Sequence, residues 1–427
     1  MPSRISRRRF LESSTAGALS LGAAPLLFGE DPKPPASERL RVGIIGVAGK
    51  GESNWKPIAA AGAEIVAGCD VDESRTGMFR TAHPKAAFYA DFRKLLDAKG
   101  LDAVVVSTPD HMHALPTLMA LRAGLHVYCE KPLTHTIAEA RLIAETAAKH
   151  KRVTQMGTQI HAGTNYRRVV ELIQSGAIGN VSEVHTWVPT VYNGNGQRPP
   201  EEAIPKTLHW DLWLGSALDR PYNKVYVPFS WRKFWTFGGG ALNDMACHHM
   251  DLPFWALKLR APTKVSATGS TPTPETASDW LTVQYDFPGV KLNWYDGGKR
   301  PKLVTDGTAP DWKAGNLFIG DKGMLIADYG RLMLLPEKQF AGFKPPAPTI
   351  PDSVGHHKEW VLACKTGGPT TCNFDYSGAL TETVFLGTVA YRSGKSFEWD
   401  AANLKPKGAP EAEKFISKEY RKGWEVA

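Results

Sequence analysis

Short apolar runs alternate with helical patterns over the first third of the chain. Five runs have the character of buried strands, and the segments between them have the spacing of helices; the runs are RVGIIG, AEIVAGC, DAVVVST, LHVYCE and RVTQMG. Continuous apolar strands separated by helices are typical of a parallel sheet covered on both faces, and right-handed crossovers make such a sheet doubly wound. Residues 39–160 are therefore predicted to form one α/β domain.

The pattern changes after about Gly163. Strand-like runs now follow one another with few helices between them; examples are VSEVHTWVPTVY, TKVSATGS, WLTVQYDF and KLNWYD. Consecutive strands without intervening helices favour antiparallel pairing. Residues 161–427 are predicted to form an α+β domain that contains a largely antiparallel sheet, with helices returning at residues 356–365 and near residues 376–392.

Residues 1–38 are predicted to be a signal peptide and a linker. The segment SRRRFL precedes an apolar stretch that is short and rich in small residues, which favours an export signal over a membrane span. It resembles the twin-arginine signal, whose pathway moves proteins already folded around their cofactors. We expect a periplasmic or otherwise exported protein without a membrane span in its mature form. An uncleaved anchor is the alternative.

Composition narrows the possible classes of protein. The 427 residues are 42% hydrophobic and 22% charged, which are values for a globular chain with a large core. The formal net charge is +8, but lysine and arginine are scattered, so nucleic acid is not expected as a partner. The five cysteines lack paired spacing and contain no CxxC, which indicates neither a disulfide framework nor a zinc ribbon.

A glycine-rich loop, GVAGKG, joins the first strand to the first helix. Gly46 permits a tight turn, and Gly51 permits close packing of the helix. Ala48 stands where a glycine usually lets the backbone approach a pyrophosphate, and Gly49 can share that role. Backbone N–H groups here and at Lys50 would face the phosphates at the helix N-terminus. The loop predicts a dinucleotide site, with a simple turn as the alternative.

Asp70 ends the second strand, where a carboxylate can accept hydrogen bonds from the ribose hydroxyls of the adenosine half. A negative charge there would repel a 2′-phosphate, so NAD is favoured over NADP. Arg75 lies close to Asp70 in the sequence, and its positive charge would instead favour the 2′-phosphate of NADP. A turn carboxylate at the end of a strand is the structural alternative for Asp70.

Three later stretches carry a resemblance to a known family: VVVSTPDHMHA, YCEKPLTHTIAEA and GGGALNDMACHHMD. They resemble the Gfo/Idh/MocA family of NAD(P)-dependent oxidoreductases, which includes glucose–fructose oxidoreductase and inositol dehydrogenases. The resemblance spans residue 40 to the C-terminus and implies an N-terminal Rossmann domain. The segments HWDLWLG and YRKGW are similar to those of exported bacterial members with a twin-arginine signal.

The motif Glu130-Lys131-Pro132 follows the end of a strand, where ligands of doubly wound sheets bind. The resemblance implies that Lys131 points at nicotinamide and substrate and that the bond to Pro132 is cis. Beside an oxidised nicotinamide the pKa of the ammonium would be lowered, which suits a group that receives or relays a hydroxyl proton. A surface salt bridge is the alternative role for Lys131.

The segment Thr108-Pro109-Asp110-His111-Met112-His113 ends another strand, so its backbone should border the cofactor. The His-x-His spacing could suggest a metal, but the sequence offers no third ligand, and we predict no metal site. Thr108 and Pro109 are predicted to contact the cofactor. His111 and His113 are expected to shape the nicotinamide pocket or to cap the following helix.

Asp244 and His248 are four residues apart and should share one face of a helix, which Asp251 extends by a turn. An Asp–His pair can pass on a proton from a substrate hydroxyl while hydride leaves the adjacent carbon. With Lys131, these two residues are the predicted catalytic set. A pair on the helix surface is the alternative, and His249 is expected to pack elsewhere.

Tryptophans are dense early in the second domain, at positions 187, 210, 213, 231 and 235. Sugar rings stack their C–H faces on aromatic side chains, although core packing is the alternative for each tryptophan. Trp187, Trp231 and Gln159 are predicted to contact a carbohydrate substrate, together with the carboxylate and imidazole of the predicted catalytic set.

An exported nicotinamide enzyme has no soluble pool that restores its cofactor. We therefore expect NAD to be held tightly during hydride transfer at a hydroxyl carbon of a sugar or cyclitol. The alternatives are redox-neutral glycoside cleavage by oxidation, elimination, hydration and re-reduction, sugar–sugar hydride exchange, and a non-catalytic binder. Analogy with the family suggests a homo-oligomer.

Overall fold

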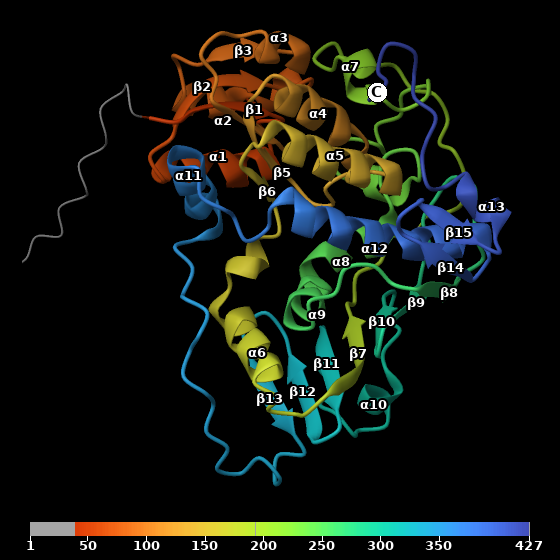
Figure 1. The fold of residues 1–427 in the computed structure, drawn as a ribbon. Helices are drawn as coiled ribbons and strands as arrows, with labels where there is room; N and C mark the ends of the chain where they lie inside the picture. The colour runs from red at the N-terminus through yellow and green to blue at the C-terminus, as the bar shows by residue number, and fades with distance from the viewer. Residues whose placement is uncertain (1–38, 193, 427) are drawn as a thin grey trace, which may run out of the picture.

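The computed structural model describes residues 39–192 and 194–426 (Figure 1). The predicted signal peptide and linker lie outside the described residues. The first domain contains a six-stranded parallel sheet, ordered β3-β2-β1-β4-β5-β6. Its strands are β1 (Arg41–Ile45), β2 (Glu64–Cys69), β3 (Ala87–Tyr89), β4 (Ala103–Val106), β5 (His126–Cys129) and β6 (Thr154–Met156). The prediction of a doubly wound sheet is confirmed, and the strand order reverses between β1 and β4, where such sheets bind ligands.

Helices cover both faces of this sheet. They are α1 (Lys50–Ala60), α2 (Gly77–Ala82), α3 (Phe92–Leu96), α4 (Ala114–Arg122) and α5 (Ile137–His150), with the short turns η2 (Glu73–Arg75) and η3 (Asp110–Met112). The start of α5 shows how local sequence sets a boundary. The Thr136 side chain accepts a hydrogen bond from the Glu139 N–H, and the Glu139 carboxylate accepts one from the His135 N–H. These bonds satisfy backbone donors that a helix start leaves unpaired.

The second domain contains a nine-stranded sheet in the order β13-β12-β11-β7-β10-β9-β8-β14-β15. Its strands are β7 (Val181–Trp187), β8 (Lys264–Gly269), β9 (Leu281–Phe287), β10 (Val290–Tyr295), β11 (Gly315–Gly320), β12 (Gly323–Ala327), β13 (Leu332–Leu335), β14 (Phe397–Asp400) and β15 (Lys405–Lys407). Neighbouring strands are antiparallel except β7 and β10. Buried and half-buried positions alternate along β9, as expected for a sheet with one face in the core. The predicted antiparallel character is confirmed.

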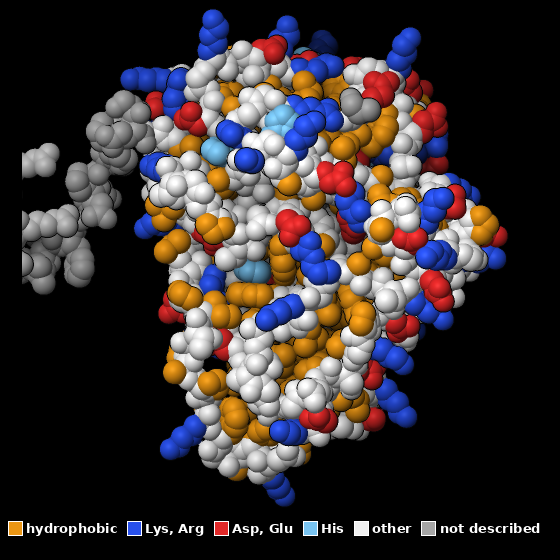
Figure 2. Space-filling view, viewed as in Figure 1, with side chains coloured by type: hydrophobic (Ala, Val, Ile, Leu, Met, Phe, Trp, Pro, Cys, Tyr) orange, Lys and Arg blue, Asp and Glu red, His pale blue; other side chains and the backbone are white. Residues whose placement is uncertain are grey.

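Some helical elements of the second domain pack near this sheet, and others pack against the first domain. These elements are η4 (Gln159–Ala162), α6 (Thr164–Gln174), α7 (Trp210–Leu214), η5 (Ser230–Lys233), α8 (Gly240–His249), α9 (Asp251–Ala256), α10 (Lys302–Thr305), α11 (His356–Thr366), α12 (Phe374–Ser393) and α13 (Pro410–Glu413). Helix α11, for example, shares a buried cluster with α1. Among the described residues, no helix has both the length and the apolar character needed to cross a membrane. Acidic and basic side chains are interspersed on the face that Figure 2 shows.

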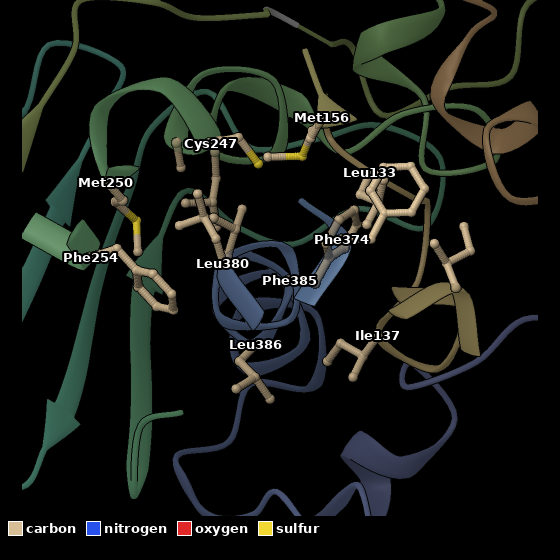
Figure 3. Close-up of a cluster of buried hydrophobic side chains, with 14 of the residues drawn as sticks. Leu133, Ile137, Met156, Cys247, Met250, Phe254, Phe374, Leu380, Phe385 and Leu386 are labelled. Carbon is tan, nitrogen blue, oxygen red and sulfur yellow. The ribbon is translucent and has the colours of Figure 1, made fainter. Parts of the chain in front are cut away.

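Helix α12 runs between the two domains and joins their cores (Figure 1). In the close-up, Leu380 and Phe385 of α12 lie among side chains from the first domain, such as Leu133, and from α8 and α9, such as Cys247 and Phe254 (Figure 3). All of these residues are buried in one hydrophobic cluster. Because this core is continuous, the two walls of any site between the domains are held in a fixed relation.

A buried contact between a histidine and an aspartate gives one stability prediction. The His161 Nδ1 lies 2.9 Å from a carboxylate oxygen of Asp251, and the Tyr376 hydroxyl donates to the same carboxylate at 2.7 Å. Both paired side chains are at most 2% exposed. Asp251→Ala should lower the free energy of unfolding by about 3–5 kcal/mol, because it leaves its partners buried and unpaired.

Urea unfolding measures this loss, and Asp375→Ala is the matched control. Asp375 forms an ion pair with Arg260, but its side chain is 78% exposed. Such a pair contributes about 1 kcal/mol or less. Equal losses in the two variants would contradict a structural role for the buried pair.

Candidate active site

A cavity of about 620 Å³ lies between the domains, at the carboxyl ends of β1, β2, β4 and β5. Its walls come from both domains. Among the residues that line it are Gly46, Ala48, Gly49, Lys50, Asp70, Thr108, Pro109, Asp110, His113, Glu130 and Lys131 from the first domain, and Trp231, Arg232, Asp244 and His248 from the second. The volume suits a cofactor or small-molecule site.

The glycine-rich loop forms one end of the cavity and has the geometry of a phosphate cradle. Gly46 has a φ of +83°, and a Cβ atom there would lie 2.8 Å from the Ser107 carbonyl oxygen. A Cβ at Gly51 would lie 1.8 Å from the Gly46 carbonyl oxygen, so α1 packs directly on the turn. Gly49 and Lys50, at the N-terminus of α1, line the cavity. Side chains would close these approaches, so the loop fits a bound pyrophosphate.

Asp70 holds this loop in place. One oxygen of its carboxylate accepts hydrogen bonds from the N–H groups of Val47 and Ala48, at 3.1 and 3.3 Å, and the other accepts one from the Asp72 N–H at 3.0 Å. Burial raises the pKa of Asp70, and these backbone N–H groups oppose the shift. The side chain also lines the cavity, and its contact with an adenosine ribose stays a prediction.

Glu130 forms a polar junction behind the loop. Its Oε1 accepts hydrogen bonds from Asn54 Nδ2 and from Gln159 Nε2, each at 2.9 Å, and Lys50 Nζ lies 3.6 Å away. Gln159 also donates to the hydroxyl of Tyr128. Gln159 therefore lies behind Glu130 and does not line the cavity. The structure does not place it where it could make the predicted contact with a substrate.

Lys131 and Asp244 form an ion pair across the domain boundary. Lys131 Nζ donates to Asp244 Oδ1 and to the Asp244 carbonyl oxygen, both at 2.6 Å. The side chains are 12% and 11% exposed. Burial opposes both charges, yet Asp244 raises the pKa of Lys131, and Lys131 with Arg232 holds the pKa of Asp244 well below its ordinary value. Both groups are charged in this pair, and the lowered pKa that we expect for Lys131 beside an oxidised nicotinamide stays a prediction.

Two further side chains contact the Asp244 carboxylate, and sequence reasoning missed both. Arg232 Nε lies 3.3 Å from Oδ1, and the Tyr192 hydroxyl donates to Oδ2. Arg232 stands on η5 one residue after Trp231, and Tyr192 stands in the loop after β7. Neither belongs to a motif whose spacing indicates a site, so only the fold could have brought them together.

His248 lines the same cavity but makes no hydrogen bond to Asp244 among the described contacts. Burial, reinforced by the ammonium of Lys131, lowers the pKa of His248, so its imidazole is neutral. His249 is buried on another side of α8, where its Nε2 lies 2.9 Å from the Tyr329 hydroxyl. The helix thus presents Asp244 and His248 to one cavity, as their spacing predicts, but Asp244 is paired with Lys131.

Asp110 is a further ionisable group of the cavity, and the sequence analysis assigned it no role although it stands in the quoted STPDHMH segment. It is 4% exposed and lines the wall together with Lys131 and Asp244. Burial raises the pKa of Asp110 to about 8, while Arg232 opposes this shift and Asp244 reinforces it. Near neutral pH the carboxyl therefore carries a proton and can donate it.

This carboxyl makes the stability of the fold depend on pH. The ordinary pKa of an aspartate is 3.8, so between that value and about 8 the folded protein binds a proton that the unfolded chain has lost. The free energy of unfolding must fall as the pH rises through this window. Asp110→Asn should match the natural protein below pH 3.8 and be more stable than it above pH 8.

Urea unfolding midpoints of both proteins across this range measure the effect. Asp296, which is also buried and has its pKa raised to about 7, is present in both proteins and cancels in the difference. Curves that run parallel across the whole range would show that Asp110 titrates normally.

Two other predicted residues, His111 and Pro132, lie away from the cavity surface, whereas His113 is part of it. His111 packs against Trp213 and Phe237, with its Nε2 2.9 Å from the Trp213 carbonyl oxygen. Pro132 follows Lys131 through a cis bond, as the resemblance implied, and is not part of the wall. His113 is part of the wall, but its two nitrogens face the carbonyl oxygens of Pro132 and Thr108 rather than capping α4.

Trp187 requires a correction, because the structure does not bring it near the cavity. It is fully buried on β7, where it packs with Val304, Trp312 and Leu317 in a separate cluster. Its indole N–H donates to the Trp312 carbonyl oxygen at 2.8 Å. Trp187 is therefore a core residue, which was the alternative for each tryptophan, whereas Trp231 does line the cavity.

One group among the described residues has the composition of a metal site. Ligand atoms of His161, Asp251 and Cys372 lie within 4.8 Å of one another. The Asp251 carboxylate is already satisfied by the His161 ring and the Tyr376 hydroxyl. The group is buried in the second-domain core and does not line the cavity.

Sequence models of known protein families show which family this chain belongs to. The sequence model of an oxidoreductase family with an NAD-binding Rossmann fold, Gfo/Idh/MocA, matches residues 40–158. The model of the C-terminal alpha/beta domain of the same family matches residues 162–426. The chain belongs to the Gfo/Idh/MocA family. This family is an oxidoreductase family, and its model for the first domain describes an NAD-binding Rossmann fold.

The individual curated relatives match only part of this chain, and their sequence identity to it is low. Inositol 2-dehydrogenase 1 of Saccharopolyspora erythraea is 34% identical over 34% of this chain and 44% of its own length. The α-N-acetylgalactosaminidase of Shewanella oneidensis is 28% identical over 42% of this chain and 44% of its own. The chain thus spans about half the length of these relatives.

Solved structures show the same fold over most of the chain. The WlbA dehydrogenase from Bordetella pertussis, solved in complex with NADH and UDP-GlcNAcA, superposes with a TM-score of 0.62. The match covers 85% of this chain and 99% of that one, at 18% identity. At this identity the likeness concerns the fold alone.

Proposed function

We propose that this oxidoreductase transfers hydride between a hydroxyl carbon of a sugar or cyclitol and a tightly bound NAD. The observation that supports this most strongly is the Lys131–Asp244 pair, which lies in one cavity with the glycine-rich loop and with His248. Bound NAD supplies the hydride acceptor. The side chains must then orient the hydroxyl and handle its proton.

The charge states suggest how this work is divided. Lys131 is held protonated by Asp244, so its Nζ can donate a hydrogen bond to the substrate oxygen and stabilise the negative charge that develops there. His248 is neutral, so its ring can accept the hydroxyl proton. Asp244 fixes the position of Lys131, and Tyr192 and Arg232 fix Asp244 in turn.

The second-domain wall of the cavity suits a polyhydroxylated ring. Trp231 offers an aromatic face, and the Arg232 guanidinium lies over the rings of Trp231 and Phe229, at 4.3 and 4.4 Å. Aromatic faces with a few polar groups are typical of carbohydrate sites. Two relatives with names that refer to inositol and to a glycoside support the same substrate class.

Cofactor analysis and substrate trials test this proposal together. Protein purified without added cofactor should release NAD on denaturation, as detected by mass spectrometry. Incubation with inositols and free sugars should then yield reduced cofactor in a single turnover. Protein that carries no nicotinamide would contradict tight binding, and the absence of reduction with every polyol would contradict the dehydrogenase assignment and leave a binder.

Asp110 favours redox-neutral glycoside cleavage as a second candidate. Elimination of a leaving group beside a transient ketone needs an acid that protonates the departing oxygen, and the neutral Asp110 carboxyl is such an acid. Aryl glycosides distinguish the candidates, because cleavage releases the aglycone without net reduction of cofactor. Reduction without release would favour dehydrogenation, and release only on addition of a second sugar would favour hydride exchange.

Export by the twin-arginine pathway and a homo-oligomeric state remain part of the proposal. The SRRRFL segment supports export, and Arg7→Lys together with Arg8→Lys should retain the protein in the cytoplasm of the producing cell. Unchanged export of the double variant would contradict a twin-arginine signal. Light scattering of the purified protein should give a multiple of the monomer mass of 46.7 kDa.

A further inference from the structure

A second cavity, of about 490 Å³, lies against α8 and α12 and shares no lining residue with the candidate active site. Asn243 of α8 faces it, whereas the next residue, Asp244, faces the candidate active site. The remaining walls are the start of α5, the segment that carries Trp235, one face of α12, and the C-terminal segment after α13.

Arg392, in the last turn of α12, provides a positive charge in this cavity. Its guanidinium lies over the rings of Trp235 and Phe415, at 4.8 and 4.4 Å. It has no hydrogen bond and no ion pair to any described residue. Burial lowers the pKa of Arg392 to about 10, and no neighbouring carboxylate offsets that shift. A largely buried cation without a counter-ion is costly, and a bound anion would remove that cost.

Three other cations of this cavity have carboxylate partners within the protein. Lys418 Nζ lies 3.0 Å from a carboxylate oxygen of Glu139. Arg198 and Arg220 lie 2.7 and 2.9 Å from the two carboxylate oxygens of Glu275. Lys414 also lines the cavity, but it is exposed to solvent. The guanidinium on α12 is therefore the largely buried cation of the lining for which the described residues offer no carboxylate partner.

Apolar side chains flank the Arg392 guanidinium, although the lining as a whole is mixed and includes the carboxylates of Asp219, Glu275 and Glu419. Phe385, Thr388, Val389 and Arg392 line the cavity from one face of α12, because they follow the three- and four-residue spacing of a helix. The Trp235 and Phe415 rings extend this surface on either side of the guanidinium. An anion with a compact apolar body would place its charge on Arg392 and its body against Phe385 and Val389.

We propose that this second cavity binds a small organic oxyanion, a carboxylate or a phosphate, through Arg392. A planar guanidinium matches both groups, because it can donate two parallel hydrogen bonds to either. The proposal does not depend on the reaction proposed above.

Fluorine NMR of para-fluorobenzoate tests the site. Its line should broaden with the natural protein and sharpen again when unlabelled benzoate is added, but not when neutral benzyl alcohol or NAD is added. Arg392→Met, which keeps the length of the stem between the two rings, should weaken binding at least tenfold. The control, Lys338→Met, removes an exposed cation from outside the cavity and should bind as the natural protein does.

Competition by acetate and by inorganic phosphate distinguishes the two anion classes, since the better competitor identifies the class. Displacement by NAD, equal binding by Arg392→Met, or no broadening at all would overturn the proposal. A second experiment uses only the natural protein, so its result does not depend on whether the variant folds. Phenylglyoxal should modify Arg392, as mapped by peptide mass, and benzoate should slow that modification; a benzoate-independent rate would also overturn the proposal.

Discussion

Lys131→Met should lower turnover by at least about a thousandfold while leaving NAD bound. The side chain supplies the ammonium that meets the substrate oxygen in the proposed mechanism, and general acid–base and electrostatic groups of this kind contribute about 10²–10⁴ in rate. In the proposed binding mode the cofactor would be held mainly by backbone groups of the glycine-rich loop and by Asp70, which the substitution does not touch. The measurements are single-turnover reduction and NAD content by mass spectrometry.

Lys149→Met is the control for this substitution. Lys149 is an exposed residue near the end of α5, so its loss should leave turnover and NAD content unchanged. Turnover by Lys131→Met within a few-fold of the natural protein would contradict the assigned role. Loss of NAD in that variant would instead assign Lys131 to cofactor binding.

Gly51→Ala should have the second largest effect, on both folding and cofactor affinity. The new methyl group would lie 1.8 Å from the Gly46 carbonyl oxygen and 2.8 Å from the Gly46 carbonyl carbon. These are backbone atoms, so α1 or the turn must move. Overpacking of this kind costs about 1–3 kcal/mol or more. Because the same turn forms the phosphate cradle, NAD affinity should fall at least about tenfold.

Gly77→Ala tests whether any glycine-to-alanine change at a helix start has this effect. Gly77 begins α2, has ordinary backbone dihedral angles, and a Cβ atom there would have no neighbour within 4 Å. That variant should be neutral or slightly more stable, by up to about 1 kcal/mol. Thermal melting and NADH titration compare the two proteins. Equal behaviour of the two variants would contradict the close packing inferred for Gly51.

The sequence predicts the architecture well because its signals are local. Buried parallel strands favour apolar runs, and five of the six strands of the first sheet lie in the runs named from the sequence. Strand β3 escaped prediction because it has only three residues, half-buried or exposed, at the edge of the sheet. The glycine-rich loop was predictable for a related reason. Side chains at its glycines would clash with nearby backbone, and the loop that carries this requirement is only six residues long.

The candidate site was only partly predictable, because its contacts join distant segments. Lys131 and Asp244 were identified individually, but their ion pair spans the domain boundary and depends on how α12 joins the cores. Tyr192 and Arg232 belong to no motif and reach Asp244 only through the fold. Trp187 was misassigned because an indole in a strand has the same sequence pattern whether it faces the core or a ligand.

A crystal structure of the protein with NADH tests the central claim most directly. We predict that the pyrophosphate lies on the loop from Gly46 to Gly51 and that the nicotinamide ring reaches the cavity wall formed by Lys131, Asp244 and His248. A nicotinamide bound elsewhere, or a closed cavity in which Lys131 and His248 do not border the ring, would show that the proposed chemistry has no site in this protein.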